Sequence, residues 1–231
     1  MLILALACDY DETLAANGQI EPRTGRALAR LKESGCKLVL VTGRQLDDLL
    51  QVCRDCNLFD IVIAENGAVM YKPSSDQTRL LADKPPEQFL ERLRKLGVKP
   101  LAIGHSIVAT VQQHHLAVSS TIAEMGLDLE IIFNRDSLMV LPTGVNKATG
   151  LSLALEALEV PPASVVGVGD AENDAAFLEM CGLSVAVANA LPSIREAADI
   201  VTAEDHGAGV VEVINKVISG DLLRMRTPAQ R

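Results

Sequence analysis

The chain has 231 residues, 48% of them hydrophobic and only 3% aromatic, and it carries a formal net charge of −9 at pH 7. This length suits one or two domains, whose core must be built from aliphatic side chains. The acidic balance argues against a nucleic-acid surface, which needs clustered Lys and Arg to neutralise phosphates. No run approaches the roughly 20 apolar residues of a membrane span, so we expect no membrane partner.

The five cysteines are an odd number, and only Cys53 and Cys56 have the spacing of a metal or redox pair. No second pair and no neighbouring His completes a zinc site. We interpret the cysteines as reduced thiols, which are typical of the cytoplasm.

Up to residue 83 the chain alternates between strand-like and helix-like segments. Strands are predicted at Leu2–Cys8, Lys37–Val41, Ile61–Ala64 and Ala68–Tyr71, with a turn at Glu65–Gly67 before the last. Helices are predicted at Pro22–Ser34 and Gln45–Cys56, with proline opening the first. This repeated β-α-β order indicates a parallel sheet.

Residues 84–143 follow a different pattern. Helices are predicted at Glu87–Leu96 and Leu116–Met125, and short strands at Pro100–Ile103, Ile107–Gln112, Leu129–Phe133 and Leu138–Leu141. One helix followed by two strands, repeated once, predicts a small α+β module.

From residue 144 the α/β alternation resumes. Helices are predicted at Ala148–Leu158, Asn173–Met180, Pro192–Ala197 and Gly209–Ile218, and strands at Ser164–Val168, Leu183–Val187 and Ile200–Val201. We therefore predict a core domain made of residues 1–83 and 144–231, interrupted by a cap of residues 84–143. Residues 222–231 are expected to form a flexible tail.

Four polar clusters carry the chemistry. They are Asp9–Thr13, Thr42–Arg44, Lys147 and Gly169–Asp174, and apolar runs precede the first, the second and the last. In open parallel sheets, ligands bind at the carboxyl ends of the strands. We therefore expect the four clusters to converge on one crevice.

The clusters resemble the signature of haloacid dehalogenase superfamily phosphatases, which is D-x-D-x-T, then Thr or Ser, then Lys, then G-D-x-x-x-D. Asp9, Asp11 and Thr13 match the first part, and the rest follow in order over nearly the whole chain. The resemblance implies an α/β fold with a Rossmann-like parallel sheet core. The inserted module resembles the small cap of a subclass that includes archaeal-type phosphoglycolate phosphatases and sucrose-phosphate phosphatases.

The first motif supplies the predicted catalytic carboxylates. Asp9 is the expected nucleophile, because a carboxylate at a strand end can attack phosphorus and form an aspartyl-phosphate. Asp11 points to the same side two residues later, where it can protonate the leaving group and then activate water. The resemblance implies that Thr13 steadies the loop, whereas Glu12 departs from the glycine most common there.

The other motifs predict phosphate and metal binding. The Thr42 hydroxyl and the Gly43 amide can donate to phosphoryl oxygens, and Lys147 supplies a positive charge. Asp170 and Asp174 are expected to hold Mg²⁺ together with the Asp9 side chain and, by resemblance, the Asp11 backbone carbonyl. Arg44 can equally reach the substrate or lie on a surface helix.

We therefore predict a Mg²⁺-dependent phosphomonoester hydrolase acting on a small phosphorylated metabolite, with phosphoglycolate as the first choice. A sugar-phosphate phosphatase and a phosphomutase are alternatives within the superfamily. A phospho-accepting receiver domain, which also clusters Asp, Thr and Lys, is an alternative from another class. The sequence leaves open the oligomeric state and which of Asn134, Arg135 and Asp136 reach the substrate.

Overall fold

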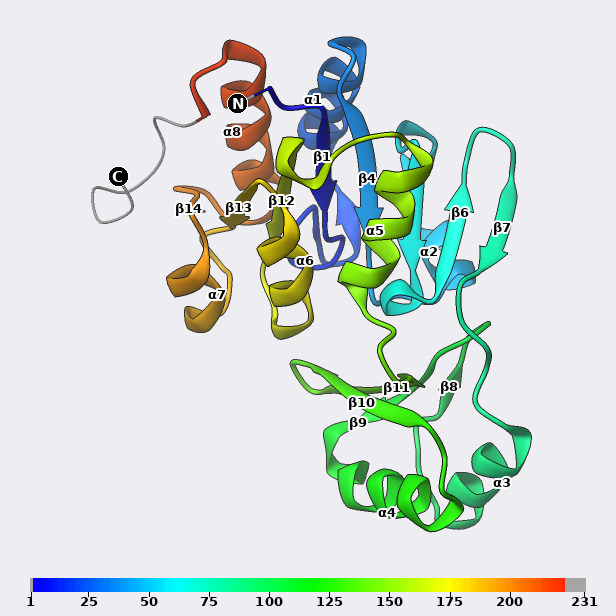
Figure 1. Ribbon diagram of the computed structural model, residues 1–231. Helices are drawn as coiled ribbons and strands as arrows, with labels where there is room; N and C mark the ends of the chain where they lie inside the picture. Colours follow the sequence, from blue (N-terminus) through cyan, green and yellow to red (C-terminus); the bar gives the residue numbers. More distant parts are fainter. Residues whose placement is uncertain (1, 223–231) are drawn as a thin grey trace.

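The computed structural model describes residues 2–222 and contains two main sheets, each with its own helices, and a small two-stranded hairpin (Figure 1). The larger sheet has eight strands in the order β14-β13-β12-β1-β4-β5-β6-β7. Their bounds are β1 Ala5–Cys8, β4 Lys37–Val41, β5 Ile61–Ala64, β6 Val69–Lys72, β7 Gln77–Leu80, β12 Val165–Gly169, β13 Leu183–Ala186 and β14 Ile200–Val201. This order and the inserted second sheet confirm the predicted α/β fold with a cap.

The large sheet is parallel from β14 to β5 and antiparallel at β6 and β7. The prediction of a parallel sheet is therefore wrong at this edge. A single 3-10 turn, Glu65–Gly67, joins β5 to β6, and so short a connection can only reverse the chain. The exposed edge strand β7 was not predicted, because its residues are mostly polar.

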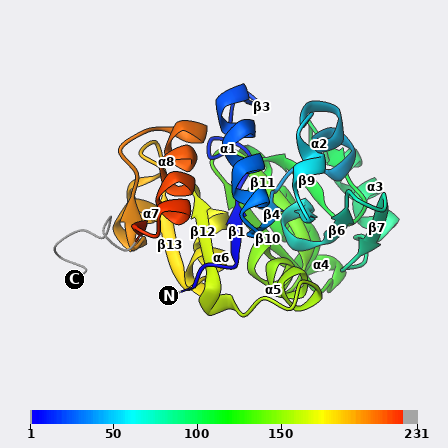
Figure 2. The same cartoon turned by 90° about the horizontal axis from the view of Figure 1, so that it is seen from above.

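Helices cover both faces of this sheet. Their bounds are α1 Pro22–Glu33, α2 Leu46–Val52, α5 Lys147–Ala157, α6 Ala175–Met180, α7 Pro192–Ala197 and α8 His206–Ser219. Helix α1 packs against α8 and α5 packs against α6, and Figure 2 shows these two pairs on opposite faces. The strands between them are buried on both sides, as the apolar sequence of β1 requires.

Two local predictions need correction. The helix predicted to reach Cys56 ends at Val52, because the backbone leaves the helical region at Cys53 (φ −88°, ψ 88°) and a 3-10 turn, Cys56–Leu58, follows. A small hairpin of β2 (Ala15–Ala16) and β3 (Gln19–Ile20) was missed. Its signal is Asn17-Gly18, since both residues have positive φ and Asn-Gly is a favoured hairpin turn.

The cap is an antiparallel sheet of four strands, in the order β10-β11-β9-β8, backed by two helices. The bounds are β8 Ala102–Ile103, β9 Val108–Val111, β10 Leu129–Asn134, β11 Ser137–Pro142, α3 Glu87–Lys95 and α4 His115–Met125. Phe89, Leu90 and Leu93 of α3 meet Val118 of α4 and Leu138 of β11 in a core separate from that of the large sheet. The cap therefore has its own hydrophobic packing.

The chain end differs in part from the prediction. Leu222, assigned to the tail, is buried and packs into the main core. The rest of the predicted tail lies outside the described residues. No helix within residues 2–222 combines the length and hydrophobicity needed to cross a membrane.

Candidate active site

The four motifs meet at the carboxyl edge of the large sheet, between core and cap. Asp9 follows β1, Thr42 follows β4, and Asp170 follows β12, the parallel neighbour of β1. Lys147 opens α5 and Asp174 ends a 3-10 turn, Glu172–Asp174, before α6. All five residues are at most 5% exposed. Burial of four ionisable groups together requires that each be paired.

Lys147 is the buried cation of this cluster. Its Nζ lies 2.6 Å from Asp9 Oδ1 and 2.5 Å from Asp174 Oδ1. Asn146 places it by capping α5, accepting hydrogen bonds from the amides of Ala148 and Thr149. The Asn146 carbonyl passes so close to Gly67 that a Cβ there would lie 2.0 Å from its oxygen. A glycine in the β5–β6 turn thus permits the position of Lys147.

Protein donors also hold carboxylate oxygens of Asp174 and Asp170. Asp174 Oδ2 accepts the backbone amides of Asp170 (2.8 Å) and Ala171 (3.0 Å). The Thr13 hydroxyl donates to Asp170 Oδ1 over 2.7 Å, which gives this motif threonine a structural contact. Oxygen atoms of Asp9, Asp170 and Asp174 all lie within 4.8 Å of one another. Three aspartates are therefore preassembled on one side of Lys147.

Burial and mutual repulsion shift the pKa values of these groups. Burial raises the pKa of Asp9 well above 3.8, and Lys147 offsets only part of that effect. Burial and then Asp174 raise the pKa of Asp170. For Lys147, burial lowers the pKa, but Asp174 and Asp9 outweigh it, so the pKa lies above its ordinary value and the ammonium stays charged.

This cluster fits a hard divalent cation. It offers three carboxylates, oxygen ligands of the kind Mg²⁺ prefers, against one buried ammonium. A divalent cation would oppose the burial and the mutual repulsion that raise the pKa values of Asp9 and Asp170. Asp11, the fourth predicted ligand, does not place its carboxylate in this cluster.

The Asp11 carboxylate instead pairs with Arg44. Arg44 donates from Nε and Nη2 to the two Asp11 oxygens, each over 2.7 Å, and from Nη1 to Asp48. The Arg44 amide donates to Thr42 Oγ1 (3.1 Å), so the Thr42 hydroxyl accepts here and keeps its own proton to donate. Arg44, whose role the sequence left open, therefore holds Asp11 in place.

Glu12 has a backbone conformation that favours glycine, the residue most common at this position of the motif. Its φ is 58°, in the left-handed region that favours glycine. His206 contacts Glu12 Oε2 (2.9 Å), and the Asn189 amide donates to the Glu12 carbonyl (2.7 Å). These contacts hold the motif loop in shape without glycine.

A cavity of about 400 Å³ opens over the cluster. Its walls come from the core at Asp9, Asp11, Thr42, Gly43, Arg44, Gln45 and Asp48, and from the cap at Ala102, Ala109, Asn134, Ser137 and Met139. This volume suits a small metabolite. The catalytic and phosphate-binding residues predicted from sequence line this cavity, except Lys147, which is buried beneath it.

Comparison with known proteins decides the family. A model of haloacid dehalogenase-like hydrolases matches residues 6–113 and 128–214. The chain belongs to the haloacid dehalogenase-like hydrolases. It is a phosphatase of that superfamily, acting on phosphomonoesters, which confirms the enzyme prediction over the receiver-domain alternative.

Relatives of this hydrolase span nearly its whole length. It is 34% identical over 232 residues to "Phosphoglycolate phosphatase 2" of Saccharolobus solfataricus, covering 94% of each chain. It is 30% identical over 217 residues to "Phosphoglycolate phosphatase" of Methanothermobacter thermautotrophicus, covering 92% of this chain and 97% of the relative. A haloacid dehalogenase-like hydrolase from Bacteroides thetaiotaomicron shares the fold, with a TM-score of 0.81 at 21% identity and coverage of 93% and 99%.

Two contacts between core and cap of the hydrolase were not predicted. Arg135, in the β10–β11 turn, extends from the cap and donates from Nη2 to Asp170 Oδ2 over 2.5 Å. Glu65, expected only to form a turn, is fully buried and accepts the cap amides of His105, Ser106 and Ile107 at 2.7–3.0 Å. Neither has a local sequence signal, because both depend on where the cap lies.

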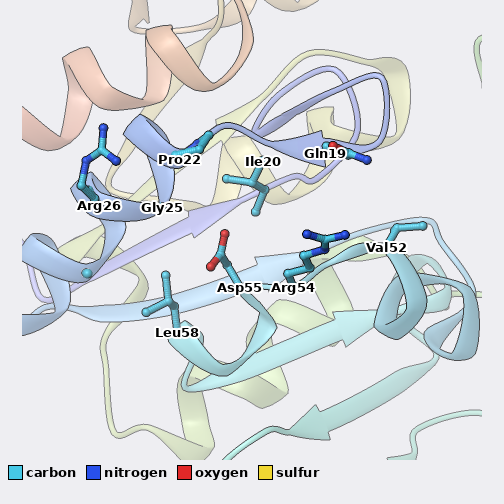
Figure 3. Close-up of a pocket in the computed structure, with 10 residues that line it drawn as sticks. Gln19, Ile20, Pro22, Gly25, Arg26, Val52, Arg54, Asp55 and Leu58 are labelled. Atoms are coloured by element: carbon cyan, nitrogen blue, oxygen red, sulfur yellow. The ribbon is translucent and has the colours of Figure 1, made fainter.

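A second hollow, of about 550 Å³, lies away from the motifs (Figure 3). It is bordered by α1 and by the segment that follows α2, with Asp55 pointing into it opposite Ile20 and Pro22. None of the four motifs contributes to its lining. The chemistry of the hydrolase therefore belongs to the smaller cavity under the cap.

Proposed function

We propose that the protein is a Mg²⁺-dependent phosphomonoester hydrolase that works through an aspartyl-phosphate on Asp9. The observation that carries this proposal is the Asp9 carboxylate itself, at the end of β1, paired with Lys147 and grouped with Asp170 and Asp174. Such a carboxylate is held in place as a nucleophile and lies next to a cation that can offset the charge of a phosphoryl group.

Each predicted residue has a role consistent with its position. Asp9 attacks phosphorus, and Lys147 stabilises charge on the transferring group. The Thr42 hydroxyl and the Gly43 amide donate to phosphoryl oxygens at the end of β4. Asp11 protonates the leaving oxygen and then takes a proton from the attacking water, which releases phosphate and restores Asp9.

Asp11 can act only after its contact with Arg44 changes. Arg44 donates to both Asp11 oxygens, so a proton on either oxygen would face a guanidinium donor. Asp11 must therefore turn away from at least one Arg44 nitrogen before it gives a proton. The surrounding cavity leaves room for that rotation, since the Asp11 side chain is 39% exposed.

Mg²⁺ would be held by Asp9, Asp170 and Asp174, with the Asp11 carbonyl as the remaining protein ligand that we propose. When bound, it supplies Lewis-acid stabilisation of phosphoryl oxygens. The fit rests on three buried carboxylates of one cluster that carry more negative charge than Lys147 balances.

Phosphoglycolate is the substrate we put first. The support comes from two relatives with that activity in their names, at 30% and 34% identity over nearly the full length. The cavity of about 400 Å³ also suits a short leaving group. We place the reaction in the cytoplasm because all five cysteines are free thiols, as a reducing compartment favours.

The test is release of inorganic phosphate from phosphoglycolate and a panel of sugar phosphates, with Mg²⁺ or with a chelator. We expect phosphoglycolate to react fastest, chelator to abolish the reaction, and Asp9→Asn to abolish it with Mg²⁺ present. The matched control is Asp128→Asn, which changes an exposed aspartate of the cap. Turnover by the Asp9 variant would refute the aspartyl-phosphate, and phosphate transfer within a sugar phosphate would favour a mutase.

A further inference from the structure

The tip of the β10–β11 hairpin is an unusual part of the cap. Asn134 pairs with Ser137, so Arg135 and Asp136 alone make the turn. Arg135 has a φ of 50°, at a hairpin position where glycine is favoured. A strained residue of this kind persists when its side chain has a function or its surroundings hold it there.

The surroundings hold this tip on two sides. Gln112 Nε2 of the cap donates to the Arg135 carbonyl, and the Arg135 amide donates to Glu172 of the core over 3.3 Å. The guanidinium then reaches Asp170, a buried member of the candidate metal cluster. The Arg135 side chain is 42% exposed, whereas that of Asp170 is 2% exposed. The cap thus presents a partly solvated cation at the reacting end of the site.

The other cations at the described site are already committed. Lys147 is buried between Asp9 and Asp174. Arg44 forms a two-pronged pair with Asp11 and also contacts Asp48. Asp170, by contrast, has Thr13 as a second donor and so does not depend on Arg135 alone. Arg135 is therefore the cation that can leave its partner most readily, since Asp170 keeps the Thr13 hydrogen bond and a bound metal ion would replace the lost positive charge.

We propose that Arg135 exchanges its partner during binding: it leaves Asp170 when a divalent cation occupies the cluster and then binds a carboxylate on the leaving group of the substrate. This inference rests on the proposed function and names Arg135 as the residue that selects substrates with a carboxylate. A cation on Asp170 repels the guanidinium, and a planar carboxylate is its best alternative partner. In a phosphorylated 2-hydroxy acid, that carboxylate lies next to the ester carbon, close to the phosphoryl group.

The kinetic test compares phosphoglycolate with 2-hydroxyethyl phosphate, which replaces the carboxylate by a neutral hydroxymethyl group. Wild type should favour phosphoglycolate in kcat/KM, and Arg135→Gln should lower that value about 10- to 100-fold, as expected for a lost charged hydrogen bond. The value for 2-hydroxyethyl phosphate should change less than about threefold. Arg94→Gln, which breaks an exposed ion pair on the cap, is the matched control.

Two further measurements separate this role from a structural one. Arg135→Gly removes the guanidinium but relieves the positive φ, so its melting temperature should not fall while its preference for phosphoglycolate is lost. Arg135→Gln should bind Mg²⁺ more tightly than wild type in calorimetric titration without substrate, because a competing cation is gone. Unchanged Mg²⁺ affinity would overturn the exchange.

The outcomes also distinguish this inference from the proposed function. If wild type hydrolyses both compounds equally, or if Arg135→Gln slows both equally, the phosphatase assignment stands and the carboxylate role is overturned. If wild type with Mg²⁺ releases phosphate from no compound in the wider panel, the proposed function fails and this inference falls with it.

Discussion

Replacing Lys147 with Met tests whether its buried ammonium stabilises the fold by pairing with Asp9 and Asp174. Met keeps most of the aliphatic stem and removes the ammonium, which contacts Asp9 and Asp174 and lies over the Phe177 ring. Removing one partner from a buried ion pair costs about 3–5 kcal/mol. For a chain of this length each kcal/mol shifts the melting temperature by about 2–4 °C, so we expect a loss of roughly 6–20 °C in chelator.

The melting temperature is measured with chelator and with saturating Mg²⁺, and Lys95→Met, at the end of α3, is the surface control. Mg²⁺ should restore more stability to the Lys147 variant than it adds to wild type, because Asp9 and Asp174 then lose the cation that they share in the described structure. A variant that melts within about 2 °C of wild type in chelator would refute this account of the cluster, since the expected shift is several-fold larger.

The same variant has a predictable pH dependence. Burial already raises the pKa of Asp9 above 3.8, and Lys147 is the main group that opposes this shift. Without Lys147, folded Asp9 binds a proton that the unfolded chain releases above about pH 3.8. Stability from this group is then present at low pH and lost as pH rises through the folded pKa. The deficit of Lys147→Met should therefore shrink as pH falls toward 5, whereas a constant deficit would contradict it.

Two other regions give separate predictions. Glu65→Gln should weaken the contact between this residue and the cap loop by about 1.5–3 kcal/mol. Hydrogen exchange should then be faster at the amides of residues 105–107 but unchanged in α3. Exchange at these amides as slow as in wild type would show that the carboxylate is dispensable. Burial raises the pKa of Cys36 to about 11 and that of Cys181 to about 12, from 9.0. The thiols of the unfolded chain ionise at lower pH than the buried ones, so the stability of the folded protein should fall as pH rises above about 9. The fall should be less steep in Cys181→Ala. Urea midpoints of this variant and of wild type that change in parallel from pH 8 to 11 would contradict the prediction.

The sequence predicted the parts of the fold that local patterns determine. The parallel strands β1, β4, β5 and β12 have apolar runs bounded by turns, and their order follows from β-α-β connectivity. The antiparallel direction of β6 was missed because a run of apolar residues predicts a buried strand without indicating its direction in the sheet. The β2–β3 hairpin did have a signal in Asn17-Gly18, which the more prominent motif beside it obscured.

The site, like the fold, has residues whose position the sequence predicts and others whose position depends on packing between domains. Asp9, Asp170 and Asp174 could be expected to meet because strand ends of one parallel sheet share an edge, whereas the place of Lys147 was implied by the resemblance to the family. The structure brings all four together. Arg135 could not, because its contact with Asp170 requires the cap to lie over that edge. Local sequence specifies which side chains a strand presents, whereas packing between domains selects their partners.

The charges of the site connect the cap to the chemistry. Three cations from three segments, Lys147 of α5, Arg44 after β4 and Arg135 of the cap, each pair with a motif aspartate. Lys147 is fully enclosed and so fixes the nucleophile, whereas Arg44 and Arg135 are 24% and 42% exposed at the side chain and can reorient at lower desolvation cost. In the proposed mechanism, binding of a metal ion and an anionic substrate rearranges these two arginines. Cap position and charge balance are therefore coupled, because one of the two arginines belongs to the cap.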